Sequence, residues 1–241
     1  MNLMRHEAES LAHEIDGVAA EYAPVEIILA PPMSSMQCVA GTIDSVALAA
    51  QNFHPEEKGN FTGETSVTMI AEFAKYAIVG HSERRQHFHE TDEDINKKVV
   101  SALEHGLTPI LCFGEDEKQR SAGQTPRIIQ EQLHRALAGV RIGGDQEIIA
   151  AYEPVWAISG SDSSRVATAS EVGEAIDVAH EVLEETLGSL STSVSLVYGG
   201  STSPENCEEI FAIGRVQGAL VGGKSLEADS FLAIAKHLQE A

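Results

Sequence analysis

The 241-residue sequence predicts an α/β fold, a parallel sheet covered by helices, and the architecture that fits best is a (β/α)8 barrel. Short apolar runs alternate with longer amphipathic stretches along almost the whole chain. The apolar runs are continuous, which is typical of parallel strands that are buried on both faces. Since no linker, low-complexity tract or charge block interrupts the chain, we predict one domain over residues 1–241.

Seven apolar runs have the length and composition of buried strands. They are residues 25–30, 45–52, 76–81, 108–115, 147–154, 193–200 and 217–223. A closed barrel has eight strands and begins on a strand, whereas this chain begins with an amphipathic helical pattern. A doubly wound open sheet could use seven strands, so the strand count leaves both architectures possible.

Polar residues at the carboxyl ends of these runs favour the barrel, because a barrel of this type gathers its chemistry there. These residues are Asn52, His81, Glu115, Glu153, Ser201 and the pair Gly222 and Gly223.

The helical stretches between the strands have recognisable starts. Thr91 leads TDED and Thr168 leads TASE, both of the capping-box type. Thr125 and Ser203 each stand before a proline, which suggests a cap residue followed by proline at the first helical position. With the helix at the front, the pattern predicts eight helices.

The composition excludes several classes of partner. The formal net charge is −21, from 37 acidic and 16 basic residues spread along the chain, which argues against nucleic acid and anionic membranes. No apolar run approaches the length of a membrane span. Cys38, Cys112 and Cys207 lack the spacing of metal or redox motifs, so we expect a reducing cytoplasm and no metal.

A set of short motifs makes the prediction specific. VGHSERRQHF, LCFGE, AYEPVWAI, YGGS and GALVGGKSL occur in this order, with AQN and FTGETS earlier in the chain. In combination they resemble the triosephosphate isomerases, and the likeness extends from the first helix to the last. The resemblance implies a TIM barrel and a cytoplasmic homodimer of glycolysis and gluconeogenesis. Such an enzyme interconverts dihydroxyacetone phosphate and D-glyceraldehyde 3-phosphate without a cofactor.

Glu153 and His81 are the predicted catalytic residues. Glu153 ends an apolar strand, and a carboxylate partly removed from water is a stronger base for taking a proton next to a carbonyl. His81 ends another strand before SERR, where the positive end of a helix dipole disfavours the imidazolium cation. Either residue alone would more often be structural or solvated. Their pairing as glutamate base and neutral histidine is the established pattern of the family that the chain resembles.

The resemblance also implies supporting roles for Glu83, Cys112 and Asn52. In the family, the residue that matches Glu83 pairs with a lysine that binds and polarises the substrate. That lysine stands in an Asn-x-Lys motif at the end of a strand directly before the residues that match Met1 and Asn2. We therefore expect a strand and a lysine upstream of Met1, and we expect the 241 residues alone to be a weak isomerase or none.

Main-chain amides are the predicted phosphate ligands. Gly222 and Gly223 close the last strand, and Ser201 follows a second glycine pair, which leaves amides accessible to a dianion. After Glu153, a polar stretch rich in small residues has the composition of a closing loop, about three residues longer than in the family. Within it, the resemblance assigns Ser159 and Gly160 to the phosphate. Lys224 could supply a cation, although a solvated side chain is the expected state.

The connection from Phe53 to about Ser66 is longer than most in compact domains. In the family the matching loop reaches into the neighbouring subunit, which implies dimer contacts for Thr62, Gly63 and Glu64. The plain alternative is a surface loop.

Two other functions remain open at this stage. A homologue without the lysine could be a catalytically impaired or inactive phosphate-binding scaffold, but such a protein would not need both Glu153 and His81. Another phosphate-handling barrel enzyme is the second alternative, and PVWAI and GHSERR argue against it.

Overall fold

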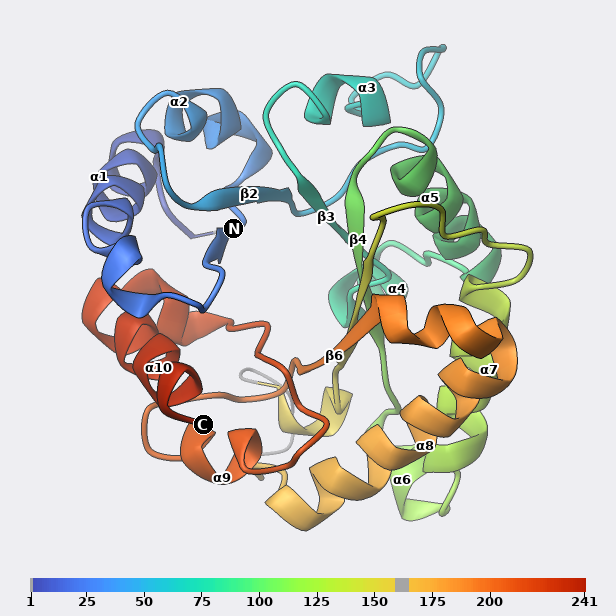
Figure 1. Cartoon of the computed structure of the whole chain (residues 1–241). Helices are drawn as coiled ribbons and strands as arrows, with labels where there is room; N and C mark the ends of the chain where they lie inside the picture. Colours follow the sequence, from blue (N-terminus) through green and yellow to red (C-terminus); the bar gives the residue numbers. More distant parts are fainter. Residues whose placement is uncertain (1, 159–164) are drawn as a thin grey trace.

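The computed structural model describes residues 2–158 and 165–241, and its strands form one curled parallel sheet inside a ring of helices (Figure 1). Six strands follow one another in chain order, each paired with the next, so every connection is a crossover of the same kind. They are β1 (Ile28–Leu29), β2 (Ala47–Ala50), β3 (Tyr76–Val79), β4 (Thr108–Phe113), β5 (Ile148–Tyr152) and β6 (Val194–Tyr198).

The seventh predicted strand, residues 217–223, is much shorter than expected. Tyr198 and Ala219 form a single parallel bridge pair, and hydrogen bonds from Tyr198 N to Gly218 O and from Leu220 N to Tyr198 O hold the segment beside β6. Within the described residues, this segment pairs with β6 and with no other strand.

The described residues form ten α-helices, two more than predicted. They are α1 (Arg5–Asp16), α2 (Met36–Ala40), α3 (Val67–Ile70), α4 (Ser82–His87), α5 (Asp92–Glu104), α6 (Glu117–Ser121), α7 (Thr125–Ala136), α8 (Ala169–Leu187), α9 (Cys207–Phe211) and α10 (Ala228–Glu240). The difference arises because some connections hold two helices, as with α4 and α5 between β3 and β4. None of the helices in this part of the chain is long and apolar enough to span a bilayer.

The capping predictions have mixed outcomes. Thr91 and Thr168 each complete a capping box, as predicted. Thr125 is the first residue of α7 and not its cap. Its hydroxyl donates a hydrogen bond to the buried carboxylate of Glu115 at 3.2 Å. The start predicted at Ser203 is wrong, because the Asn206 side chain accepts the Ser203 N–H and holds a turn until α9 begins.

Alternation along the strands produces two apolar layers. Ile110 and Cys112 of β4 belong to a small cluster that also contains Ala151, within the curl of the sheet. Leu111 and Phe113, the alternate residues, belong to the large cluster between sheet and helices. Burial on both faces explains why the strands read as continuous apolar runs.

The two ends of the chain lie on the same side of the ring, where α1 contacts α10 (Figure 1). Gln239 of α10 donates to the carbonyls of Glu21 and Ala23 beyond α1. The last residue of α1, Asp16, accepts the backbone N–H groups of Asp44, Ser45 and Val46, which lead into β2. Burial tends to raise the pKa of Asp16, but these three hydrogen bonds lower it overall.

We expect Asp16→Asn to lower the free energy of unfolding by about 1–3 kcal/mol at pH 7, because a neutral amide accepts fewer and weaker hydrogen bonds. A lowered pKa means that the carboxylate stabilises the fold above the ordinary aspartate pKa of about 3.9. This contribution is lost as the pH falls through the lower value of the folded state. Urea unfolding from pH 7 to pH 3 should therefore show a smaller acid dependence for the variant. The exposed Asp44→Asn is the control, and equal losses in both variants would contradict the role of Asp16.

Candidate active site

The carboxyl ends of β3, β4 and β5 bring the two predicted catalytic residues into contact. His81 follows β3 and Glu153 directly follows β5, and parallel strands end at the same edge of the sheet. His81 Nε2 lies 3.1 Å from Glu153 Oε1. The Glu153 side chain is only 2% exposed, whereas His81 is 27% exposed and borders the solvent.

Glu153 is a buried carboxylate with one anchored and one free oxygen. Oε2 accepts the backbone N–H of Ser82 at 2.9 Å. Oε1 accepts no hydrogen bond from the described residues, because the nearby imidazole lies within reach but is not aligned as a donor. Burial raises the pKa of Glu153, and the opposing effects of His81, the Ser82 amide and Cys112 do not cancel it. Oε1 is therefore a basic atom that is available for a proton.

His81 has a defined tautomer when it is neutral. It occupies the N-cap position of α4, and its Nδ1 accepts the backbone N–H of Glu83 at 3.3 Å. Because an amide N–H can only donate, the ring proton of the neutral imidazole lies on Nε2, the atom that faces Glu153. The Glu83 carboxylate is mostly exposed and lies 4.0 Å from Nδ1.

Two small residues form the wall behind Glu153. Cys112 is fully buried, and its thiol lies against the Glu153 carboxylate, so burial and then the Glu153 charge raise the thiol pKa. Gly199 leaves the space that the Glu153 side chain occupies, since a Cβ there would lie 2.8 Å from Glu153 Cγ. The motif YGGS contained this glycine, but no pattern in the sequence showed which residue needed the space.

Glu115 is a buried site residue for which the sequence predicted a place at a strand end but no role. Its side chain is completely buried, and its carboxylate accepts hydrogen bonds from residues on both sides of Glu153 and from two helices. Its hydrogen-bond donors are Tyr152 Oη, Trp156 Nε1, Arg120 Nη1 and Thr125 Oγ1. Its position at a strand end, in LCFGE, was the available signal.

Asn52 and Lys224 do not join the pair of His81 and Glu153. Asn52 Oδ1 accepts from Lys98 Nζ at 2.6 Å, and the same ammonium pairs with the buried Glu90. Lys224 has an exposed side chain, as expected. It lies close enough to Glu205 to help lower the pKa of that carboxyl, after the larger effect of the Ser203 hydroxyl.

The predicted phosphate ligands differ in availability. Gly222 and Gly223 are exposed, and a side chain at either position would meet open space. The Ser201 N–H donates to Ala157 O at 3.0 Å, so the prediction that this amide is bare is wrong for this conformation. Ser159 and Gly160 lie outside the described residues.

The predicted dimer loop is ordered by its own backbone. Thr62, Gly63 and Glu64 are exposed at its turn, where the Glu64 N–H donates to Phe61 O at 2.9 Å. His54 pairs with the residues at the other end of the loop through two backbone hydrogen bonds. The loop extends beyond the rest of the ribbon ahead of α3 (Figure 1).

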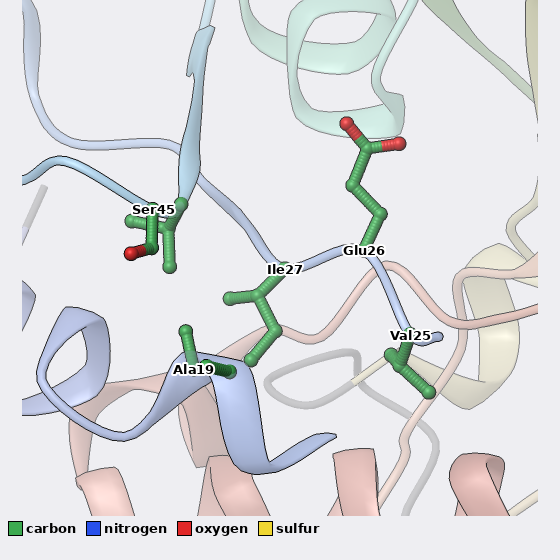
Figure 2. A pocket seen from close by; sticks show the side chains of 7 residues that line it. Ala19, Val25, Glu26, Ile27 and Ser45 are labelled. Carbon is green, nitrogen blue, oxygen red and sulfur yellow. The ribbon is translucent and has the colours of Figure 1, made fainter. Parts of the chain in front are cut away.

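A cavity of about 120 Å³ lies at the opposite, amino-terminal edge of β1 and β2 (Figure 2). Ala19, Val25, Ile27 and Ser45 line it, and the Glu26 carboxylate points away from Ala19 in Figure 2. It is smaller than typical ligand pockets, and it lies at the opposite end of the sheet from Glu153. Among the described residues, no group of three or more His, Cys, Asp or Glu side chains is arranged to hold a metal ion.

Comparisons with known proteins agree with this geometry. The sequence model of the triosephosphate isomerase family matches residues 1–238. The triosephosphate isomerase of Chloroflexus aurantiacus is 42% identical over 95% of this chain and 92% of its own length. That of Dehalococcoides mccartyi is 40% identical over 98% and 92%, and that of Thermoanaerobacter pseudethanolicus is 40% identical over 98% and 96%.

We expect Glu153→Gln to stabilise the fold at neutral pH. A carboxyl whose pKa is raised by folding costs stability as the pH rises from the ordinary glutamate value of about 4.3 through the raised value. The amide has no such cost, so the stability difference should grow over this interval and remain constant above it. Thermal unfolding between pH 4 and pH 8 measures the difference, with Glu83→Gln as the exposed control. A variant less stable than its parent at pH 7 would contradict the costly burial.

Proposed function

The chain belongs to the triosephosphate isomerase family, and we propose that Glu153 and His81 carry out its proton transfers. The protein is an isomerase that interconverts dihydroxyacetone phosphate and D-glyceraldehyde 3-phosphate, a reaction of glycolysis and gluconeogenesis. The family's fold is the (β/α)8 barrel predicted from the sequence, of which the described residues form six paired strands and the segment bridged to β6. The alternative of an inactive scaffold gains no support from the comparisons.

In the proposed mechanism, Glu153 Oε1 removes a proton from the substrate carbon next to the carbonyl. The electron pair of that C–H bond forms the carbon–carbon double bond of an enediolate, and negative charge moves to the carbonyl oxygen. His81 stabilises this oxygen through its Nε2–H. His81 then gives its Nε2 proton to this oxygen and takes the proton of the neighbouring hydroxyl, so that the negative charge moves to the second oxygen. The protonated Glu153 returns its proton to the carbon that carried the carbonyl, the second oxygen becomes the new carbonyl, and the exchange of carbonyl and hydroxyl positions is complete.

The observation that carries this proposal is the contact between a buried, proton-accepting carboxylate oxygen and an imidazole Nε2 at 3.1 Å. The two groups lie closer than they can when a substrate carbon and oxygen stand between them. Substrate binding therefore replaces their direct contact. This exchange costs little free energy, because Oε1 of Glu153 accepts no aligned hydrogen bond that would have to be broken.

For the phosphate, we propose the main-chain amides of Gly222 and Gly223, which are exposed at the proper end of the sheet. Ser201 can contribute its amide only after its bond to Ala157 O is released. The assignments of Ser159 and Gly160 rest on the resemblance alone. Supporting roles fit Cys112, which lines the wall behind the base, and Glu83, whose amide fixes the His81 tautomer. Asn52 would act indirectly, through Lys98.

We propose one domain over residues 1–241, a homodimer and a cytoplasmic location. The dimer is supported by exposed apolar side chains beside the loop of Thr62, Gly63 and Glu64, with Phe61 45% and Met69 54% exposed. The location is supported by Cys38, Cys112 and Cys207, which are all free thiols in the described structure.

Substitution of the acid–base pair tests the function. In a coupled isomerase assay we expect Glu153→Gln to lower kcat by about 10³-fold and His81→Gln by about 10²-fold, the usual sizes for a general base and a preorganised donor. His134→Gln, on the outer surface, should keep the parental kcat. The proposal fails if either active-site variant keeps the full isomerase activity of its parent, however low that activity is.

Charged substitutions test the dimer. Phe61→Asp and Met69→Asp place a carboxylate on the proposed interface, so sedimentation equilibrium should show a shift toward monomer of at least ~10-fold in Kd, because a buried unpaired charge is costly. Leu190→Asp is the matched control, since Leu190 is also a partly exposed apolar residue but lies before β6. A monomeric parent, or unchanged association in both variants, would contradict the assignment.

A further inference from the structure

Helix α4 carries His81 at its N-cap but has almost no apolar anchor. Of its six residues, only Ser82 is buried, so packing against the core cannot by itself hold the helix in place. Two arginines tie it instead. Arg84 Nε donates to Glu90 Oε1 at 3.2 Å, and Arg85 reaches the strand ends.

Arg85 bridges β3 and β4 where their pairing stops. Val79 and Leu111 are the last pair in the register of these strands. Arg85 Nε donates to the carbonyl of Gly80, the residue after Val79, at 2.8 Å. Arg85 Nη2 donates to the carbonyl of Cys112, the residue after Leu111, at 3.3 Å. The guanidinium thus links the two strands one residue beyond their last backbone pair.

Both carbonyls belong to residues next to the reacting groups. Gly80 precedes His81 in the chain, and the Cys112 thiol lies against the Glu153 carboxylate. Arg85 and Glu153 also line the same cavity of about 10 Å³. A shift of the guanidinium would therefore alter the position of His81 relative to Glu153.

Asp92, at the start of α5, holds the guanidinium in this orientation. Arg85 Nη1 lies 2.6 Å from Asp92 Oδ1, and both side chains are largely buried, at 20% and 14% exposure. A planar guanidinium can donate in three directions at fixed angles, which the single point charge of a lysine cannot reproduce. Arg135 also approaches Asp92, at 3.6 Å, but it is 60% exposed.

We propose that Arg85, oriented by Asp92, is a positioning residue that sets the distance between His81 and Glu153 for proton transfer. This inference rests on the proposed roles of those two residues. Arg85 itself does not touch the substrate. Its contribution is the fixed placement of the Gly80–Ser82 turn against the end of β4.

Arg85→Lys and Asp92→Asn test the proposal in the full chain. For Arg85→Lys we expect kcat to fall about 10- to 100-fold with KM within about twofold of the parent, because a misplacement of about 1 Å affects the transition state most. Asp92→Asn should act in the same direction by about threefold, since the guanidinium keeps its carbonyl contacts but loses its charged partner. The ¹⁵N and ¹H signals of the His81 ring, assigned by their loss in His81→Gln, should shift in Arg85→Lys.

Arg135→Met is the matched control. It removes the other arginine beside Asp92 without touching a strand end, so kcat and the His81 signals should stay parental. An Arg85→Lys variant with parental kcat and parental His81 signals overturns the inference. So does a loss of kcat that Arg135→Met reproduces, because the effect would then come from Asp92 and α5 alone.

The outcomes also separate this inference from the proposed function. If Glu153→Gln and His81→Gln are inactive while Arg85→Lys is normal, the acid–base pair stands and the positioning role of Arg85 fails. If Glu153→Gln or His81→Gln keeps full activity, the proposed function fails, whatever Arg85→Lys shows.

Discussion

The site depends on burying the Glu153 carboxylate without neutralising it through a partner. Water would lower its basicity, and a direct cation would lower it further. The protein satisfies only Oε2, with the Ser82 amide, and leaves Oε1 facing an imidazole that is not aligned to donate. A buried charge with an unused acceptor is unfavourable for folding, so the surrounding structure has to compensate for it.

That compensation comes from close packing of the backbone around Glu153 and from hydrogen bonds that hold the neighbouring residues in place. At Gly114 the backbone passes so near the Glu153 carbonyl that no side chain fits, and Gly114 has a φ of +156° that favours glycine. Gly199 leaves room for the side chain on the other side. The Glu115 carboxylate accepts hydrogen bonds from the Tyr152 hydroxyl and the Trp156 indole N–H. These residues lie directly before and shortly after Glu153 in the chain. The base is thus confined by its neighbours in the chain and in space.

The sequence predicted the strands well because burial on both faces leaves a continuous apolar run, and capping boxes such as Thr91 are local patterns. It failed at Ser203, where the Asn206 side chain competes for the backbone. It also overestimated the first and last predicted strands, because residues 25–30 contain only the two-residue β1 and residues 217–223 only one bridge pair, and strand length depends on pairing with a neighbour. Family motifs pointed to His81 and Glu153. The contact of Gly199 with Glu153 and the role of Arg85 join residues far apart in the chain, so no local pattern could reveal them.

The net charge of −21 raises the question of how the protein receives a dianionic substrate. Exposed carboxylates more than about 8–10 Å away are largely screened at physiological salt, whereas amides in direct contact with the phosphate are not. The acidic surface therefore acts mainly on the approach of the substrate, where it opposes association. The amides of Gly222 and Gly223, and the Nε2–H of His81, act after contact. Binding and catalysis can therefore rely on local dipoles even though the molecule as a whole repels its substrate.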